Sequence, residues 1–390
     1  MPMTFMTDKK IIKVARIATI PNAFNHILRQ IEIMVKNDIQ VHLISSNTEY
    51  LKILKKKVSC PHIAVEINRN INIKKDLKAL IALYFIFKKN KYDVVHSSTP
   101  KAGFLVSIAA FIARVPLRIH TFTGQRWATE TGIFRKLLMF LDIIICKLST
   151  ELYADSKSQI DFLVDSKIVK IGKIRVIGSG SFGGIDLKKF NPQENIQNRL
   201  NIFNDLKLDP DSFILIFIGR INKDKGIDEL ITAFSELSSE KYNIDLIILG
   251  NLENESNPLS DDVLNIMHNH KRIHCIGYSS TPQEYLAISD VFCLPSYREG
   301  FPTSVMEAAA MGLPAIGAKI PGTIDAIIDG KTGLLVEKKS KSSLKEAIIF
   351  FIKNPGQLKE MGERAKLRVE EDFGCEGIAN QLIKEYRNHF

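Results

Sequence analysis

The chain has 390 residues, of which 45% are hydrophobic and 25% are charged. These are the values of a globular protein, and the length indicates two domains or one large one. Recurring apolar runs exclude disorder over most of the sequence, and scattered glycines without sustained heptads exclude collagenous and coiled-coil proteins. The cysteines are five in number and widely separated, without CxxC spacing: Cys60, Cys146, Cys275, Cys293 and Cys375. This pattern indicates a reducing compartment and argues against a zinc module.

The charge is unevenly distributed along the chain. Residues 1–190 contain 31 Lys+Arg and 14 Asp+Glu, a net charge of +17, whereas residues 191–390 carry −7. The basic half is therefore predicted to meet an anionic surface or substrate. The first ten residues lack the apolar core of a signal peptide, and apolar runs such as 79–87 are shorter than the roughly 20 residues of a membrane span. We expect a cytoplasmic protein that is peripheral at the inner face of the cell membrane.

In the first half, predicted strands alternate with predicted helices. The strands are 11–20, 39–45, 92–96, 117–121, 151–154 and 173–177, and the helices are 25–36, 76–89, 103–113, 134–148 and 156–164. The strands lack the polar–apolar alternation of a sheet with one wet face. Such strands, separated by helices, are typical of a parallel sheet covered on both faces.

The pattern restarts after a polar segment, 190–198, that contains Pro192 and is predicted to be a linker. The strands of the second half are 213–219, 245–250, 273–277, 291–295, 315–318 and 332–336, and its helices are 227–236, 258–268, 282–288, 303–311, 342–354, 355–373 and 375–389. The predicted domains are therefore 1–190, 191–373 and a terminal helix, 374–390, that crosses back to the first domain. Two doubly wound sheets of this kind leave a cleft, and ligands bind outside the carboxyl ends of their strands.

The segment Gly178-Ser-Gly-Ser-Phe-Gly183 matches the dinucleotide-binding pattern GxGxxG. That function also requires a helix that opens at once and an acidic residue about 20 residues later. The sequence instead continues toward the linker, so we interpret the segment as a glycine-rich turn at the domain junction. The phosphate-binding pattern GxxxxGK[ST] is absent from the sequence.

A second glycine-containing segment, Gly219-Arg220-Ile-Asn-Lys-Asp-Lys225-Gly226, lies between a predicted strand and a predicted helix. Two cations and two glycines at the carboxyl end of a strand suit a phosphate or diphosphate, because glycine lets the backbone approach and the cations neutralise charge. A solvated basic turn would have the same composition, so this segment alone leaves both interpretations open.

The segment Glu299-Gly-Phe-Pro-Thr-Ser-Val-Met-Glu307 follows the strand 291–295. Pro302 and Thr303 favour the start of a short helix, which places Glu307 about one turn inside it. A carboxylate there can accept hydrogen bonds from a vicinal diol such as a ribose. Acidic residues are also common at helix starts because of the macrodipole, so the alternative is purely structural. The strand end at Cys275-Ile-Gly-Tyr278 could bind a flat base edge, although its pattern is weak.

Taken together, G-R-x(4)-K-G followed by E-G-F-P-x(4)-E resembles the signature of retaining glycosyltransferases of family GT4, which have the GT-B architecture. The segments 325–336 and 180–190 are also similar to that family, so the resemblance covers nearly the whole chain. The segment 120–132 resembles the branch that makes bacterial capsule, O-antigen or lipid-linked oligosaccharides. The implied fold is α/β, with two Rossmann-like domains that face a central cleft.

The resemblance implies a role for each matching residue. Arg220 and Lys225 would hold the donor diphosphate, Glu307 would bind the ribose hydroxyls, and Glu299 would face the donor sugar. The catalytic candidates are therefore Glu299, Arg220 and Lys225. The donor-binding candidates are Glu307, Gly300, Phe301, Pro302, Thr303, Ser304, Gly219, Ile276 and Tyr278.

The chain departs from the family in two loops. Thr123 occupies the position at which many members carry a histidine, and His120 lies on the preceding strand. The loop 20–24 replaces a Gly-Gly loop, so acceptor contact is expected from that side. The acceptor or cleft candidates are Asn22, Thr123, Gly124, Gln125, Arg126, Asp155 and Ser156.

The implied reaction is metal-independent transfer of a hexosyl or N-acetylhexosaminyl residue from a nucleotide sugar, with a UDP-sugar favoured. The acceptor would be polyprenyl-diphosphate-linked or a polysaccharide, and the attack would occur on the face from which the diphosphate leaves. No metal site and no cofactor are expected, because the nucleotide sugar is a substrate, and nucleic acid is not an expected partner. The alternatives are a nucleotide-sugar 2-epimerase of the same fold and a non-catalytic protein that binds sugar nucleotides or lipids.

Overall fold

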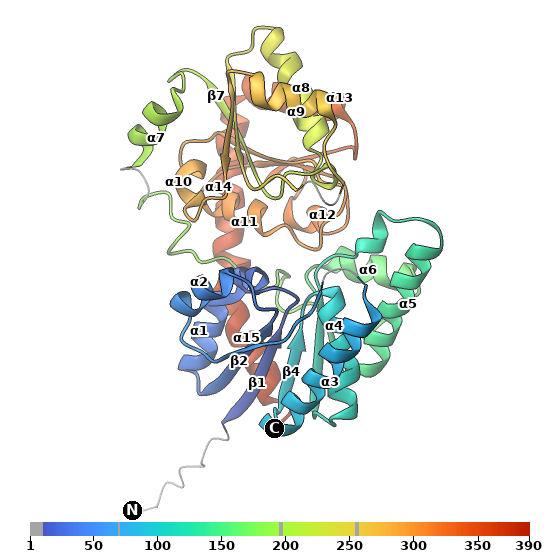
Figure 1. The fold of residues 1–390 in the computed structure, drawn as a ribbon. Helices are drawn as coiled ribbons and strands as arrows, with labels where there is room; N and C mark the ends of the chain where they lie inside the picture. The colour runs from blue at the N-terminus through green and yellow to red at the C-terminus, as the bar shows by residue number, and fades with distance from the viewer. Residues whose placement is uncertain (1–10, 69–70, 195–197, 254–256) are drawn as a thin grey trace, which may run out of the picture.

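The computed structural model describes residues 11–68, 71–194, 198–253 and 257–390. The predictions for the first ten residues and for positions 195–197 of the linker lie outside the described residues. Within the described part, the chain forms two α/β domains stacked one above the other, as Figure 1 shows. None of the helices in this part combines the length and the hydrophobicity of a membrane span.

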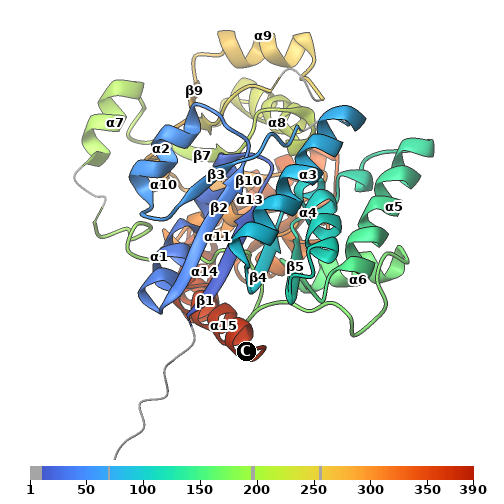
Figure 2. The ribbon, with the colours of Figure 1, turned by 60° about the horizontal axis from the view of Figure 1, so that its bottom comes forward.

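The N-terminal domain is built on a parallel sheet with the strand order β3-β2-β1-β4-β5-β6. Its strands are β1 (Ile12–Ile17), β2 (Ile39–Ser45), β3 (His62–Ala64), β4 (Val94–Ser97), β5 (Leu117–Phe122) and β6 (Glu151–Ala154). Its helices are η1 (Pro21–Ile27), α1 (Leu28–Lys36), α2 (Tyr50–Lys57), α3 (Ile73–Asn90), α4 (Pro100–Ile112), η2 (Arg126–Ala128), α5 (Gly132–Leu148) and α6 (Lys157–Asp165). Helix α4 packs between α3 and α5, and Figure 2 shows the three helices side by side.

The C-terminal domain repeats this arrangement with the order β12-β11-β10-β7-β8-β9. Its strands are β7 (Phe213–Ile218), β8 (Ile244–Leu249), β9 (Ile273–Gly277), β10 (Val291–Leu294), β11 (Ala315–Ala318) and β12 (Gly333–Val336). Its helices are α7 (Arg199–Leu206), η4 (Lys223–Lys225), α8 (Ile227–Ser239), α9 (Asp261–Asn269), α10 (Pro282–Leu286), α11 (Thr303–Ala310), α12 (Thr323–Ala326), α13 (Lys341–Lys353) and α14 (Pro355–Asp372). Both sheets have the Rossmann strand order, so the predicted doubly wound fold is confirmed.

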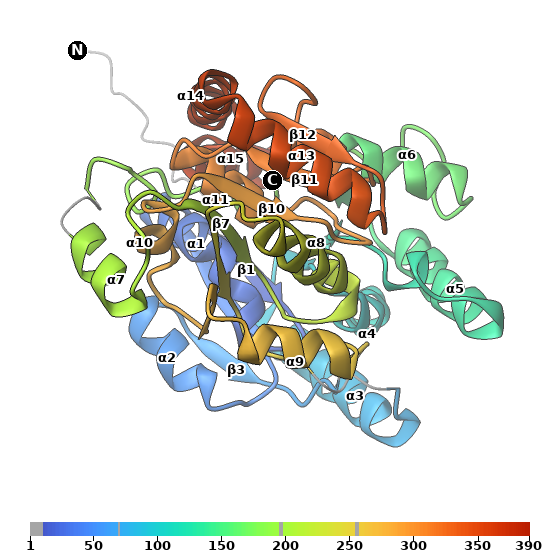
Figure 3. The ribbon, with the colours of Figure 1, turned by 90° about the horizontal axis from the view of Figure 1, so that it is seen from above.

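The last helix, α15 (Cys375–Arg387), packs against α1 of the N-terminal domain. Its Tyr386 is fully buried, and the hydroxyl lies 2.7 Å from His96 Nδ1 on β4. Figure 1 shows this helix beside α1 in the lower domain, and Figure 3 shows α14, which immediately precedes it, end-on in the other domain. The end of the chain therefore ties the two domains together.

Two predicted elements differ from the structure. The predicted helix 25–36 divides at Ile27 into a 3-10 helix and α1, because Ile27 has a non-helical backbone (φ −125°, ψ 8°). The predicted strand 173–177 makes a single bridge, Tyr153 to Arg175. The segment 178–184 forms the predicted turn at the domain junction: Gly180 has a φ of +119°, and a Cβ there would lie 2.7 Å from the Asp155 carbonyl oxygen.

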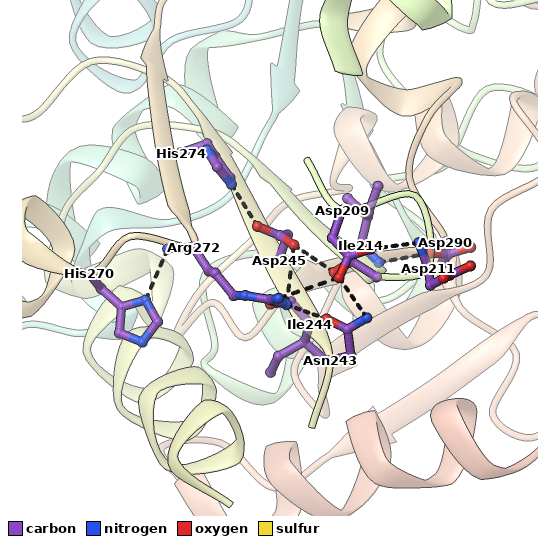
Figure 4. A network of polar contacts seen from close by, with 11 residues as sticks. Asp209, Asp211, Ile214, Asn243, Ile244, Asp245, His270, Arg272, His274 and Asp290 are labelled. Atoms are coloured by element: carbon purple, nitrogen blue, oxygen red, sulfur yellow. Dashed lines mark hydrogen bonds and ion pairs between the residues drawn. The ribbon is translucent and has the colours of Figure 1, made fainter. Parts of the chain in front are cut away.

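A polar network stabilises the amino ends of the C-terminal strands (Figure 4). Asp245 is buried and accepts hydrogen bonds from Ser212 Oγ at 2.6 Å and from His274 at 2.7 Å. Arg272 lies 3.6 Å from Asp245 and 3.5 Å from Asp209. This network lies at the opposite edge of the sheet from the carboxyl ends of its strands, so its role is to hold β7, β8 and β9 together.

Candidate active site

A cavity of about 120 Å³ lies between the two domains, at the carboxyl ends of β5, β7 and β10. It is lined by Thr123 and Gly124 from the N-terminal domain and by Arg220, Asp224, Lys225, Arg298, Glu299 and Gly300 from the C-terminal domain. In the C-terminal sheet, β7 and β10 are the neighbouring strands at which the strand order reverses. This is where doubly wound sheets bind their ligands.

Lys225 and Glu299, which come from the two predicted segments, form an ion pair in this cavity. Lys225 Nζ lies 2.5 Å from Glu299 Oε1, and both side chains are largely withdrawn from solvent. Gly226 makes the approach of the two loops feasible, because it has a φ of +69° and a Cβ there would lie 2.1 Å from the Pro295 carbonyl oxygen. A residue with a side chain would push η4 away from the end of β10.

Two further cations in the cavity are also paired with carboxylates. Arg220 Nη1 lies 2.6 Å from Glu253 Oε2, and Arg298 Nη2 lies 3.1 Å from Asp224 Oδ2. The sequence pattern identified Arg220 but not the other three residues: Asp224 falls on an unspecified position of the 219–226 segment, and Glu253 and Arg298 lie outside both motifs. An anionic ligand that enters this cavity competes with carboxylates for positive side chains.

The segment 299–307 forms the predicted loop and helix. Helix α11 begins at Thr303 and has no side-chain cap, so its first backbone N–H groups can donate to a ligand. Phe301 is buried, and its ring lies 5.2 Å from that of Phe373, which leaves its backbone as the part that can bind. Pro302 is also buried, whereas Thr303 and Ser304 are half-buried.

Glu307 is half-buried in the first turns of α11. Among the described residues, no hydrogen-bond donor contacts its carboxylate. Burial raises the pKa of Glu307 to about 7, and the positive charge of Lys189 opposes this shift. A carboxylate without a protein donor is suited to accept hydrogen bonds from ligand hydroxyls.

The strand end at β9 contributes Ile276 and Tyr278 to the same edge of the sheet. Tyr278 is 59% exposed and faces α2 of the other domain. Burial and, to a smaller degree, the hydroxyl of Tyr50 raise the pKa of Tyr278. Tyr278 therefore stands where the two domains face each other.

The acceptor candidates fall into two groups. Thr123 and Gly124 line the cavity, and Asn22 and Arg126 are exposed. Gly124 has a φ of +98°, and a Cβ on it would lie 3.0 Å from the backbone nitrogen of Gly300 in the other domain. The rim loop 123–131 therefore touches the donor-side segment directly.

The second group is buried and contacts protein. Gln125 bonds with Gln159 on α6, and Ser156 Oγ donates to the Gly300 carbonyl oxygen across the domain junction at 2.9 Å. Asp155 is 4% exposed, and its Oδ1 has no hydrogen-bond partner within the described structure. Burial raises the pKa of Asp155 well above its usual value. Of these three side chains, Ser156 is the one that joins the two domains.

Two histidines are relevant to Thr123, the position at which many family members carry a histidine. His120 is buried beneath Gly103 and hydrogen-bonds Ser97 Oγ at 2.9 Å, so it does not reach the cavity. His26 of η1, which the sequence did not single out, faces the donor side instead. Desolvation lowers the pKa of His26, and the charge of Lys225 lowers it further. Among the described residues, no three His, Cys, Asp or Glu side chains gather as a metal site would require.

Two family descriptions match the two domains. Residues 198–368 match "Glycosyl transferases group 1", and residues 16–148 match "Glycosyl transferase 4-like". Over 375 residues, 96% of each chain, the sequence is 33% identical to the capsular polysaccharide biosynthesis glycosyltransferase CapM of Staphylococcus aureus. The chain belongs to this glycosyltransferase family. A second relative is the UDP-Gal:alpha-D-GlcNAc-diphosphoundecaprenol alpha-1,3-galactosyltransferase of Escherichia coli. It is 29% identical to this glycosyltransferase over 332 residues, which are 83% of this chain and 82% of the relative.

Solved structures show the same architecture. A glycosyltransferase from Rickettsia africae superposes with a TM-score of 0.79 at 20% identity, covering 98% of this chain and 99% of that chain. Anabaena HepE, solved with UDP and glucose, superposes with a TM-score of 0.77 at 17% identity, covering 96% and 99%. These structures confirm the predicted GT-B fold, and the family matches and the named relatives confirm the predicted transferase class.

Proposed function

We propose that this glycosyltransferase moves a hexosyl or N-acetylhexosaminyl residue from a UDP-sugar to a polyprenyl-diphosphate-linked or polysaccharide acceptor in bacterial surface-glycan biosynthesis, with retention of configuration. The observation that carries the proposal is the interdomain cavity lined by Arg220 and Lys225 together with Glu299 and Gly300, the residues that lead into the uncapped start of α11. Two relatives support this substrate class: one is named as a capsular polysaccharide enzyme, and the other is named for UDP-Gal and a diphosphoundecaprenol-linked sugar.

The chemistry follows from where charge develops. When the bond between the anomeric carbon and the phosphate oxygen breaks, the diphosphate gains negative charge and the anomeric carbon gains positive charge. We assign Lys225, Arg220 and the first N–H groups of α11 to the diphosphate, because preorganised donors stabilise such charge best in a site with little water. Glu307 accepts the ribose hydroxyls, and Glu299, once Lys225 turns to the phosphate, faces the donor sugar.

The acceptor hydroxyl attacks from the face that the diphosphate leaves. A new bond forms between its oxygen and the anomeric carbon, and its proton passes to the departing phosphate oxygen. The rim loop at Thr123 and Gly124 stands on the N-terminal side of the cavity, where the acceptor would enter. This sequence of events requires no covalent intermediate on the enzyme.

The membrane part of the proposal rests on two helices of the basic domain. Helix α5 exposes Ile133, Phe134, Leu137 and Phe140, and α3 exposes Ile73, Leu77, Ile81 and Phe85. Exposed lysines and arginines accompany them, including Lys74, Lys75, Lys88, Lys89, Arg135 and Lys136. Apolar side chains flanked by cations suit an anionic lipid surface, on which a polyprenyl-linked acceptor would also be anchored.

The test is a transfer assay with a panel of UDP-hexoses and UDP-N-acetylhexosamines and a short-chain polyprenyl-diphosphate N-acetylglucosamine. NMR of the product reads the anomeric configuration. We expect transfer from at least one UDP-sugar with the donor's own configuration. An inverted product would overturn the retaining mechanism, and transfer confined to GDP- or ADP-sugars would overturn the donor assignment.

A further inference from the structure

Trp127 occupies a special place between the cavity and helix α5. It lies in η2, within the rim loop 123–131, whose first residues line the cavity and whose end leads into α5. The side chain is 1% exposed, and it is the single tryptophan of the chain. A large buried side chain in a loop normally fixes the path of that loop.

The indole of Trp127 has a charged hydrogen-bond partner on α5. Its Nε1–H donates to Asp142 Oδ2 at 2.7 Å, and Asp142 is 6% exposed. Burial raises the pKa of Asp142 to about 7, and the hydrogen bond from Trp127 opposes this shift. A buried carboxylate costs stability unless donors compensate it, so a simple packing role would be better served by an apolar residue.

The same ring is held on its faces. It stacks on Phe162 of α6 with 5.0 Å between centroids and 15° between planes, and the Arg135 guanidinium lies 5.6 Å from its centroid. Gln125, two residues before Trp127 in the same loop, bonds with Gln159 of α6. Residues of α5 and α6 thus contact the loop on both sides, and Asp142 accepts its hydrogen bond from the Trp127 indole.

Apart from Asp142, helix α5 is held by Ile145, which is buried, and by Leu138, Met139, Ile143 and Cys146, which are partly buried against the same hydrophobic cluster. Its buried residues within the described structure are Asp142 and Ile145, and Ile133 near its start is 87% exposed. Figure 1 shows α5 on the outer edge of the N-terminal domain, next to α4 and α6. The Trp127–Asp142 bond therefore links an outer, apolar helix to the loop that faces the donor segment.

We propose that Trp127 and Asp142 are positioning residues that set the rim loop 123–131 against the cavity, so that the position of helix α5 determines how an acceptor is presented. Neither side chain lines the cavity, and their effect passes through Thr123 and Gly124. This inference rests on the proposed function, because its main measurement is turnover in the sugar-transfer assay.

The test compares Trp127→Phe, Asp142→Leu, the double variant and Asp142→Asn. Trp127→Phe and Asp142→Leu each leave one buried polar group without its hydrogen-bond partner, so each should lower the thermal unfolding midpoint. The double variant should regain much of that loss, because two apolar partners carry no unsatisfied group. Turnover in the transfer assay should stay at least about tenfold reduced in the double variant, since a small misplacement of the loop suffices. Asp142→Asn, which keeps an oxygen acceptor, should retain more turnover than Asp142→Leu.

UDP binding, followed by calorimetry, should be unchanged in all these variants. The matched control is Tyr92→Phe, which removes a buried hydrogen bond to His42 (2.8 Å) elsewhere in the same domain and should lower stability without lowering turnover. If the double variant regains turnover together with stability, or if UDP binding falls in parallel with turnover, the positioning role is wrong. If the wild-type enzyme itself transfers no sugar, the proposed function has failed instead.

Discussion

The pairing of Lys225 with Glu299 helps to explain how two acidic and three basic residues can share one small cavity. Their charges compensate each other at 2.5 Å in this structure, and a donor diphosphate would replace the carboxylate as the partner of the lysine. The sequence predicted that Lys225 and Glu299 lie at the same edge, because each follows a strand whose carboxyl end must lie there, but it did not predict that they form an ion pair. It could not predict Arg298 or His26, since their positions depend on loop geometry and on how the two domains face each other.

Lys225→Ala should reduce turnover at least about a hundredfold, which is the loss typical of one preorganised donor to a developing anion. The matched control is Lys223→Ala: this lysine lies on the same 3-10 helix, but its side chain is 55% exposed and 3.8 Å from Asp228. The control should keep its turnover. Steady-state kinetics and thermal unfolding of both variants provide the measurement, and a folded Lys225→Ala enzyme with near-normal turnover would remove the diphosphate assignment.

Glu307 predicts a pH dependence of donor affinity. Its pKa is raised from 4.5 to about 7 by burial, so the carboxylate loses its charge as the pH falls below 7. Ribose hydroxyls donate better to the ionised form, and the affinity for a UDP-sugar should therefore rise between pH 6 and pH 8. Calorimetric titrations of wild type and Glu307→Gln would show this: the variant should bind more weakly, with a flatter profile. An identical slope in both proteins would assign the effect to another group.

The same shift has the opposite sign for stability. The folded protein holds the Glu307 proton up to about pH 7, whereas the unfolded chain releases it near the ordinary value of 4.5. The stability contributed by this group therefore falls as the pH rises through that interval. A half-buried carboxylate such as Glu307 lowers the stability of the folded protein near pH 7. Such a group is expected at a functional site where a ligand, rather than the protein, provides its hydrogen bonds.

The sequence predicted the helices of the basic N-terminal domain with unequal success. The helix that contains residues 80–87 was predicted, and its Ala79, Leu83 and Phe87 pack in the core as an amphipathic pattern requires. The apolar face of α5 was not recognised as exposed, because a nearly uniform apolar run does not reveal which side the sheet covers. The short elements α2 and β3 were missed for a similar reason: they depend on tertiary packing more than on local pattern.

Replacing Ile133 and Phe140 by serine tests the lipid-facing role of α5. Both side chains are exposed, at 87% and 57%, so the fold should tolerate the change. Binding to vesicles of anionic phospholipid should weaken at least about tenfold, because each buried apolar side chain contributes about 1.5–3 kcal/mol. Flotation assays provide the measurement. Leu367→Ser, at a 56% exposed position on α14, is the control and should leave binding unchanged; equal binding by all three proteins would contradict the assignment.

Specific hydrogen bonds join the two domains. Ser158 at the start of α6 bonds with Asp325, and its Oγ accepts the Gly322 N–H at 2.7 Å, while α15 secures the other side of the junction. The doubled strand–helix pattern predicted the two sheets, and parallel pairing rules gave the edge at which they bind ligands. The sequence could not give the closeness of the domains, since it depends on single contacts such as Ser156 to Gly300.

The most direct test of the account is a crystal structure of the enzyme with UDP. We predict that the diphosphate lies in the interdomain cavity, with its oxygens about 3 Å from Lys225 Nζ and Arg220, and that the ribose hydroxyls donate to Glu307. Glu299 would then have released Lys225. A diphosphate bound elsewhere, or a Lys225 that remains on Glu299 while UDP occupies the cavity, would contradict the account.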